Sequence, residues 1–319
     1  MTDESRVIFN NYQIRKTKKQ KTAFIEYVKQ LAESKGCKFS IESGSFGARN
    51  IVIGDPDRAK AVFTAHYDTC PVLPFPNFIT PCKIIYYVLY QILLTVGLIA
   101  AIIAAASLCT ASLTVVLTLA GVGLELIELV SGIVWEIVYF GGLLLMLFGP
   151  ANKHTANDNT SGVITLIEIM SALPEEAKDS FAFVFFDLEE MGLIGSSSFA
   201  KNHSLSIQSK LLLNFDCVSD GNNILLALQK GAVGSAPLLE KCFVSNDDFK
   251  VEIRSKNVFY PSDQAKFSRG VGIAALRYSK LLKTEYMSRI HTPRDTVFEE
   301  ENIEFLKNCS LCLVDELTK

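Results

Sequence analysis

Two histidines and several carboxylates of this chain lie where apolar runs end, where a predicted helix begins, or close to the C-terminus. They are His66, Asp68, Asp158, Glu189, Glu190, Asp216 and His291. Imidazole and carboxylate groups are common zinc ligands, and one carboxylate can bridge two metal ions. Because ligands of open α/β sheets usually bind at the carboxyl ends of the strands, we expect these side chains to converge there. The sequence therefore predicts a site for a pair of zinc ions.

Glu189 and Glu190 are neighbours directly after the apolar run 181–186 and Asp187. On an irregular strand end, two adjacent side chains can point in different directions. One carboxylate can then bind a metal ion while the other faces a bound water.

The apolar runs that carry these residues alternate with helical patterns after residue 150. The expected strands are 50–54, 61–65, 181–186, 211–215, 224–228 and 273–277. The expected helices are 14–35, 161–173, one that begins near 193–203, and 299–317. Buried runs that alternate with helices are typical of a parallel sheet covered on both faces. We therefore predict an α/β fold with a mixed, mostly parallel central sheet.

A long apolar block interrupts this pattern. The 66 residues from Ile84 to Gly149 contain three Glu and no Lys, Arg, Asp or Pro. A membrane span needs roughly 20 apolar residues, so we expect a transmembrane helical hairpin inserted into the catalytic domain. The predicted spans are Ile84–Ala106 and Gly132–Gly149. The stretch 111–131 fits a longer second helix, a re-entrant element or an interfacial helix.

The flanks of the block indicate its orientation. Lys83 precedes it and Lys153 follows it, and basic flanks favour the cytoplasmic side of a membrane. The chain is accordingly divided into a first catalytic part (1–82), a transmembrane insert (83–150) and a second catalytic part (151–319). A hairpin buried in a soluble domain is the alternative, but a run of 41 uncharged residues without a polar face argues against it. The three Glu of the block are expected in loop or interface positions.

Overall composition excludes some classes of protein and indicates a compartment. With 319 residues and a formal charge of −3, the chain has no basic surplus for binding nucleic acid. Its eight Cys are scattered, and the close pair Cys309 and Cys312 lacks the second pair that a zinc site would need, so buried thiols are expected. The polar, basic N-terminus shows no signal-peptide pattern. These features point to the cytosol.

Five segments together resemble the signature blocks of the co-catalytic di-zinc aminopeptidases, a family that includes bacterial leucyl aminopeptidases and glutamate carboxypeptidase II. The segments are TAHYDTC, NDNTSGV, FVFFDLEEMGLIGS, LLNFDCVSDG and IHTPRDT. The resemblance covers roughly 14–70 and 150–319, and the five blocks occur in the family's order.

The resemblance implies two zinc ions per chain and a ligand set. His66 and Asp216 would bind the first zinc. Glu190 and His291 would bind the second, and Asp158 would bridge the two.

The resemblance also implies roles around the metals. Glu189 would be the general base, and Asp68 would orient the imidazole of His66. In PSDQAKFSRGVGIAAL, Gln264 stands where the family usually has His, which puts substrate-side details in doubt. Tyr260 is a candidate for stabilising the oxyanion. His154 and His203 match nothing and are expected to be solvent residues.

The expected function is a membrane-anchored exopeptidase that hydrolyses a peptide or amide bond. Because the insert lies between two ligand blocks, the site is expected close to the cytoplasmic face of the bilayer, where apolar or acylated peptides or N-acyl amino acids could reach it. A simple anchor is the alternative role for the insert. A glutaminyl cyclase, a non-catalytic relative and a transporter with a soluble domain remain alternative functions, although a cyclase would have no need of His66 and Asp68.

Overall fold

The computed structural model describes residues 1–319 and is built around one nine-stranded sheet. The strands follow the order β1-β2-β4-β3-β5-β8-β6-β7, and β9 pairs with β8. Their bounds are β1 (Phe39–Ser43), β2 (Arg49–Ile53), β3 (Ala61–His66), β4 (Phe181–Phe186), β5 (Leu211–Phe215), β6 (Asn223–Leu228), β7 (Lys250–Arg254), β8 (Gly270–Ser279) and β9 (Thr284–Tyr286).

The four central strands of the sheet, β4, β3, β5 and β8, run parallel to one another. Antiparallel pairs lie toward the edges, where β1 and β2 flank β4 and β6 pairs with β8. The predicted mixed sheet with a parallel centre is confirmed. In the register of β3 and β4, His66 lies opposite Phe186. The residues that follow β3 and β4 therefore leave the sheet at the same edge.

Helices cover both faces of the sheet, as predicted. The bounds of these helices are α1 (Asp3–Asn11), α2 (Lys18–Ser34), α5 (Gly162–Ala172), α6 (Ile194–Asn202), α7 (Ala236–Cys242) and α8 (Glu300–Thr318). Alternate residues of β3 face opposite sides, so Phe63 packs in the large core beneath α1, α2, α5 and α8. Val62 packs in the smaller core beneath α6.

Local signals explain where some helices begin. The expected helix over 14–35 starts at Lys18 because Thr17 and Gln20 form a capping box. Cys309 and Cys312 lie on α8 and pack into or against the large core as expected, and none of the eight Cys forms a disulfide.

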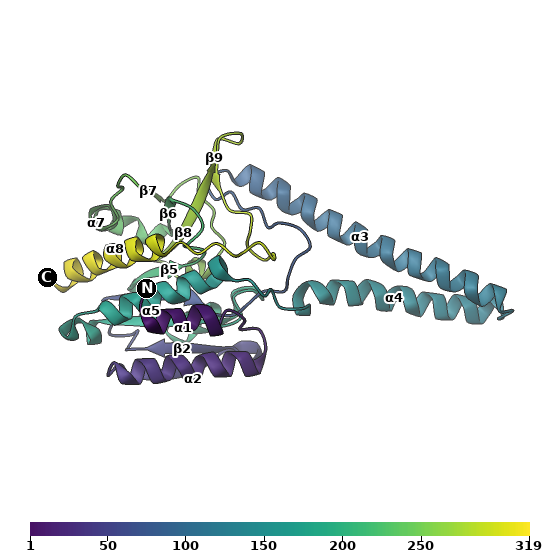
Figure 1. The fold of residues 1–319 in the computed structure, drawn as a ribbon, viewed down its shortest axis with the longest axis horizontal. Helices are drawn as coiled ribbons and strands as arrows, with labels where there is room; N and C mark the ends of the chain where they lie inside the picture. Colours follow the sequence, from purple (N-terminus) through teal and green to yellow (C-terminus); the bar gives the residue numbers. More distant parts are fainter.

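The apolar block forms two long helices, α3 (Ile84–Leu119) and α4 (Leu124–Phe148), which extend together away from the body of the molecule (Figure 1). Both are long and apolar enough to cross a membrane, and only 6% of each apolar window is buried. Both helices extend beyond the spans predicted from sequence, α3 past Ala106 and α4 to before Gly132. The stretch 111–131 is divided between the end of α3 and the start of α4. No helix breaker occurs before the turn 120–123, where Gly121 has a φ of +71°.

The two helices of the hairpin contact each other along much of their length. Thr114 and Ser131 share a 2.9 Å hydrogen bond between their hydroxyl groups, and a Cβ on Gly142 would lie 2.8 Å from Ile102. The three Glu of the block were expected in loop or interface positions, and the structure contradicts a loop position for all three. All three lie on α4, Glu125 in its first turn and Glu136 toward its middle.

The two ends of the hairpin are attached to the body of the molecule at different places (Figure 1). Pro71 and Ala151 form an isolated antiparallel bridge, and the backbone N–H of Val72 donates to the carbonyl of Pro150. A second bridge joins Ile79 to Met287. The chain therefore enters the hairpin next to the segment after β9 and leaves it next to the segment after β3.

Candidate metal centre

The five predicted metal ligands come together at the carboxyl edge of the parallel strands. His66 ends β3, Glu190 follows β4 and Asp216 follows β5 directly. Asp158 lies in the turn before α5, and His291 lies in the loop between β9 and α8. The sheet thus positions three of these side chains, and loops from other parts of the chain supply the other two.

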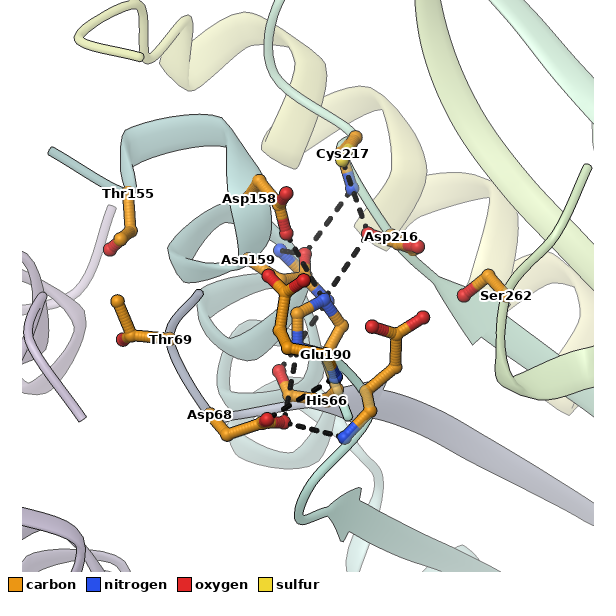
Figure 2. Close-up of polar contacts among 12 residues, drawn as sticks. His66, Asp68, Thr69, Thr155, Asp158, Asn159, Glu190, Asp216, Cys217 and Ser262 are labelled. Carbon is orange, nitrogen blue, oxygen red and sulfur yellow. Dashed lines mark hydrogen bonds and ion pairs between the residues drawn. The ribbon is translucent and has the colours of Figure 1, made fainter. Parts of the chain in front are cut away.

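Asp158 lies between the two histidines. Its Oδ1 is 3.1 Å from Nε2 of His66, and its Oδ2 is 3.0 Å from Nε2 of His291. Nε2 of His66 is also 3.5 Å from Oδ1 of Asp216, and Nε2 of His291 is 3.1 Å from Oε2 of Glu190. In Figure 2, Asp158 and Asp216 lie on one side of the His66 ring and Asp68 on the other. The donors therefore form two adjacent groups that share Asp158.

The cluster concentrates negative charge in a largely buried place. His66, Asp158 and Asp216 are buried, and no Lys or Arg pairs with Asp158, Glu189, Glu190 or Asp216. Buried carboxylates are normally paired with cations or coordinate metals. Oε1 of Glu190 is buried without a hydrogen-bond partner. This unpaired oxygen and the imidazole and carboxylate donors fit zinc.

The protonation of the two histidines follows from this charge. Burial by itself would lower the pKa of His66, but the carboxylates of Glu189, Asp158 and Asp216 outweigh it and raise the pKa well above its usual value. The same balance, with Glu190 and Asp158 as the carboxylates, raises the pKa of His291. The surrounding carboxylates thus favour positive charge at this place.

Asp68 joins the strand ends that carry the ligands. Its Oδ1 accepts the backbone N–H of Glu189 at 2.9 Å, and its Oδ2 accepts that of Glu190 at 3.3 Å. Oδ1 also lies 3.5 Å from Nδ1 of His66, beyond normal hydrogen-bond length. The strongest contacts of Asp68 are therefore with the backbone of the two Glu, and its contact with the imidazole is weaker.

Asp295 supports the turn that carries Asp158, a role that sequence reasoning missed. Its two carboxylate oxygens accept the backbone N–H groups of Asn157 at 2.8 Å and Asp158 at 3.0 Å. Burial, together with the nearby charge of Asp158, raises the pKa of Asp295 to about 8. Asp295 belongs to the same HTPRDT segment as His291, so one loop both supplies a ligand and holds another.

A cavity of about 330 Å³ opens beside the cluster. Glu189 lines it, and burial, reinforced by the charge of Glu190, raises the pKa of the Glu189 carboxyl well above its usual value. Cys217, Tyr260 and Ile290 contribute to the wall. The cavity can therefore admit a substrate group next to both metal-ligand groups and to Glu189.

Tyr260 lines this cavity, whereas Gln264 lies behind it. The hydroxyl of Tyr260 donates a 2.9 Å hydrogen bond to the backbone carbonyl of Asp216. It would have to release this bond in order to donate to an oxyanion. The buried side chain of Gln264 donates to the carbonyl of Tyr260 at 2.6 Å and accepts from Asn214 at 3.1 Å. Gln264 thus fixes the segment that carries Tyr260 and does not line the cavity.

Two further groups beside the second ligand group were not identified from the sequence. The thiol of Cys70 and one donor atom each of Glu190 and His291 lie within 4.8 Å of one another. The side-chain amide of Asn77 lies 3.4 Å from Nδ1 of His291 and accepts a hydrogen bond from Gln91 of α3 at 3.1 Å. Asn77 precedes the hairpin in a segment without a regular pattern, so no sequence signal marked it.

His203 is not the solvent residue that the sequence predicts. Its ring lies between two carboxylates, with Nε2 2.9 Å from Glu42 and Nδ1 2.8 Å from Asp57. These hydrogen bonds, the one to Glu42 first, raise the pKa of His203 to about 9. His154 is exposed, as expected. Neither residue belongs to the metal centre.

Comparison with protein families agrees with this geometry. The model for peptidase family M28 matches residues 144–314, which is more than half of the chain. The chain belongs to peptidase family M28. The matched range contains Asp158, Glu189, Glu190, Asp216 and His291. This M28 family member thus carries most of its candidate ligands within the matched region, with the second helix of the hairpin at its border.

Curated relatives match over shorter ranges. A protein described as "probable leucine aminopeptidase 2" from Aspergillus oryzae is 34% identical over 98 residues, which is 27% of this chain and 20% of that protein. Its namesake from Aspergillus fumigatus is 30% identical over 118 residues, which is 34% of this chain and 22% of that protein. The match therefore spans about a fifth of the length of these relatives.

Solved structures with the same fold cover nearly the whole chain. The Legionella pneumophila LapA aminopeptidase superposes with a TM-score of 0.58 at 15% identity, over 98% of this chain and 68% of its own. A Zn-dependent exopeptidase from Parabacteroides distasonis superposes with a TM-score of 0.55 at 15% identity, over 98% of this chain and 96% of its own. A Porphyromonas gingivalis glutaminyl cyclase superposes with a TM-score of 0.56 at 14% identity, over 98% of this chain and 95% of its own. At these identities the likeness shows the shared fold.

Proposed function

We propose that this M28 family member is a membrane-anchored metallopeptidase that binds two zinc ions and hydrolyses a peptide or amide bond as an exopeptidase. The observation that carries the proposal is Asp158, whose two oxygens lie 3.1 Å and 3.0 Å from Nε2 of His66 and of His291. A carboxylate that faces two donor groups suits a bridge between two metal ions. Membership of the family supports the same class of reaction.

In this proposal each residue has a defined task. His66 and Asp216 bind one zinc ion, Glu190 and His291 bind the other, and Asp158 bridges them. Zinc at such a site lowers the pKa of a bound water and polarises the carbonyl of the scissile bond.

Glu189 is the proposed general base. Its carboxylate lines the cavity next to the ligands, so it can take a proton from the attacking water and return it to the leaving amine. Asp68 positions Glu189 and Glu190 through their backbone N–H groups.

The hairpin is proposed to anchor the enzyme with its catalytic domain, residues 1–82 and 151–319, on the cytoplasmic side of a bilayer. Lys83 and Lys153 are exposed at the two ends of the insert 83–150. Nζ of Lys16 lies 3.4 Å from the carbonyl of Leu147, at the C-terminal end of α4. Cations at such positions favour the cytoplasmic interface and stabilise the helix end. Apolar or acylated peptides and N-acyl amino acids are the proposed substrates.

A peptide-library digest tests the function. Zinc-loaded protein in nanodiscs is incubated with peptides of random sequence, and single released residues are identified by mass spectrometry. The control is Glu189→Gln with matched zinc content, for which we expect a loss of about 10²–10⁴-fold in rate. Absence of cleavage by the wild type, or equal cleavage by the variant, would contradict the proposal.

A cyclase is the second candidate, since a solved glutaminyl cyclase matches the fold over 95% of its own chain. The presence of His66 and Asp68 at the metal centre favours the peptidase. Peptides with an N-terminal Gln in the same digest separate the two. A cyclase would release ammonia and leave the peptide chain uncut, whereas an exopeptidase would release an amino acid.

A further inference from the structure

One face of α3 lines a second cavity, of about 320 Å³, between this helix and the segment before it. Phe75 and Pro76 form one wall, and Tyr90, Leu94 and Leu98 line the other side. No charged side chain lines the cavity. We call it the α3 groove. An apolar group would fill it without leaving a charge unpaired.

The α3 groove and the metal cavity lie next to each other along one face of the helix. Tyr87 lines the metal cavity, and Tyr90, Leu94 and Leu98 follow at intervals of three and four residues. Residues with this spacing share one face of a helix. From Tyr87 to Leu98 the face extends about 16 Å at 1.5 Å per residue. The metal cavity and the α3 groove therefore follow one another along one face of α3, and we call this face the apolar track.

Hydrogen bonds fix the near end of this track to the metal centre. The hydroxyl of Tyr90 donates to the carbonyl of Pro76, and Gln91 donates to Asn77 at 3.1 Å. Asn77 in turn lies 3.4 Å from Nδ1 of His291. Because Pro76 lines the groove and Asn77 lines the metal cavity, this short segment places the groove at a set distance from the ligands.

The length of α3 places the track at the membrane surface. Its 36 residues extend about 54 Å, while the hydrocarbon core is about 30 Å thick. The first part of α3, nearest the sheet, must then lie at the interface. Tyr86, Tyr87 and Tyr90 lie in this part, and Tyr is enriched at membrane interfaces. A molecule dissolved in the outer part of the bilayer could enter the groove sideways.

We propose that the α3 groove binds the acyl chain of an N-acylated amino acid or peptide whose acyl amide is hydrolysed at the metal centre. The proposal rests on the proposed function. The groove begins next to the metal cavity, where the scissile carbonyl would lie, and an acyl chain is bonded directly to that carbonyl. Water adds its hydroxyl to the carbonyl carbon, the C–N bond breaks, and the amine leaves with the second proton. The products are a free fatty acid and an amino acid or peptide.

A pair of glycine variants tests the groove. Gly97 lines it, and a Cβ at this position meets no atom within 4 Å, so Gly97→Leu can fill the groove without a clash. Gly132 on α4 is equally open, and Gly132→Leu adds the same side chain away from the groove. Each protein, zinc-loaded in nanodiscs, is given N-acetyl and N-lauroyl forms of the same amino acid.

We expect the wild type to hydrolyse the lauroyl substrate with at least about tenfold higher kcat/KM. Gly97→Leu should remove this preference, whereas Gly132→Leu should match the wild type with both substrates. Partitioning into the bilayer affects all three proteins equally, so it does not explain a difference between the variants. Equal kcat/KM for both substrates, or an unchanged preference in Gly97→Leu, would overturn the groove while leaving the peptidase function intact.

A binding measurement gives a second readout that needs no turnover. Glu189→Gln in nanodiscs is irradiated with an N-acyl amino acid that carries a photoreactive group in its chain, and the labelled peptides are mapped. The proposal is supported if residues 75–76 and 87–98 are labelled and if adding Gly97→Leu removes this labelling. Labelling spread over all faces of α3 and α4 would show bilayer contact only and would overturn it. If no amide or peptide is cleaved by the wild type in either assay, the proposed function itself fails.

Discussion

The backbone N–H of Glu189 donates a 2.9 Å hydrogen bond to Oδ1 of Asp68. This bond joins the end of β3 to the end of β4, two strands that are neighbours in the sheet. The same carboxylate accepts the N–H of Glu190 at 3.3 Å. One side chain therefore sets the positions of the proposed base and of a proposed ligand together.

Replacing Asp68 should impair turnover more than binding of substrate. In Asp68→Ala both N–H groups lose their acceptor, so Glu189 and Glu190 lose their fixed position, and we expect kcat to fall about 10–100-fold with KM little changed. Asp68→Asn keeps one acceptor oxygen and should lose less. Steady-state kinetics with a cleaved peptide check this. A variant Asp68→Ala with wild-type kcat would rule out the positioning role.

Asp158→Ala should lower the zinc content. Its two oxygens face both imidazoles at about hydrogen-bond distance, so removing them takes a ligand from both metal ions at once. We expect clearly less than the two equivalents predicted for the wild type. Metal analysis after gel filtration checks this, with Asp248→Ala, at an exposed carboxylate, as control. Two full equivalents in Asp158→Ala would contradict the bridge.

Asn77→Leu should weaken one metal site selectively. Nδ2 of Asn77, a hydrogen-bond donor, is the side-chain atom next to Nδ1 of His291, so Asn77 limits where the imidazole can lie, and losing a neighbour that positions a metal-binding histidine typically costs 10–100-fold in affinity. We expect one zinc equivalent to be released at lower chelator concentration and the other to be unchanged. Asn77→Asp, which can accept from the imidazole, should restore the affinity. Equal release of both ions in Asn77→Leu would show that Asn77 has no specific link to His291.

His203 should contribute pH-dependent stability. Its pKa is about 9 in the folded protein against a usual 6.5, because of hydrogen bonds to Glu42 and Asp57. A raised pKa stabilises the fold fully below pH 6.5 and loses this effect as pH rises through 9. We expect His203→Gln to cost about 1 kcal/mol at pH 6 and nothing at pH 10. Melting temperatures at both values, with His154→Gln as control, check this; an equal cost at both would contradict it.

Labelling of introduced cysteines should reveal the orientation of the hairpin. Gly121 lies in the turn at its tip, and Lys153 lies just after its end. In a Cys109→Ser background, an impermeant maleimide applied to intact cells should label Gly121→Cys and reach Lys153→Cys only after permeabilisation. The reverse pattern would place the catalytic domain on the other side. Labelling of both sites in intact cells would contradict a bilayer between them.

The parts of the site that lie on the sheet could be predicted from the sequence. Apolar runs such as 181–186 end in carboxylates, and a parallel sheet brings such ends to one edge. His291 was different, because it lies on a loop whose position no local pattern shows; its residue type made it a candidate ligand, and the resemblance to a family gave it a place in the ligand set. Asn77 and Asp295 could not be assigned, since their roles depend on which backbone or side-chain groups the folded loops bring to them.

Two physical features explain why some elements were missed or misplaced in the sequence analysis. Strands β1 and β7 lie at the edges of the sheet and carry few buried residues, so their apolar pattern is weak. The limits of α3 and α4 could not be read from hydropathy, because the whole block is apolar. They are set by the glycine-containing turn 120–123.

The bridge between Pro71 and Ala151 limits how the catalytic domain can move relative to the hairpin. A domain tethered through one flexible linker can swivel freely about it. Here the chain after α4 is paired with Pro71 and the chain before α3 with Met287, so the hairpin is attached at two points and swivelling is restricted. In a bilayer the mouth of the cavity would keep a constant tilt, and turnover would scale with the surface density of substrate among the lipids and hardly with its concentration in bulk water.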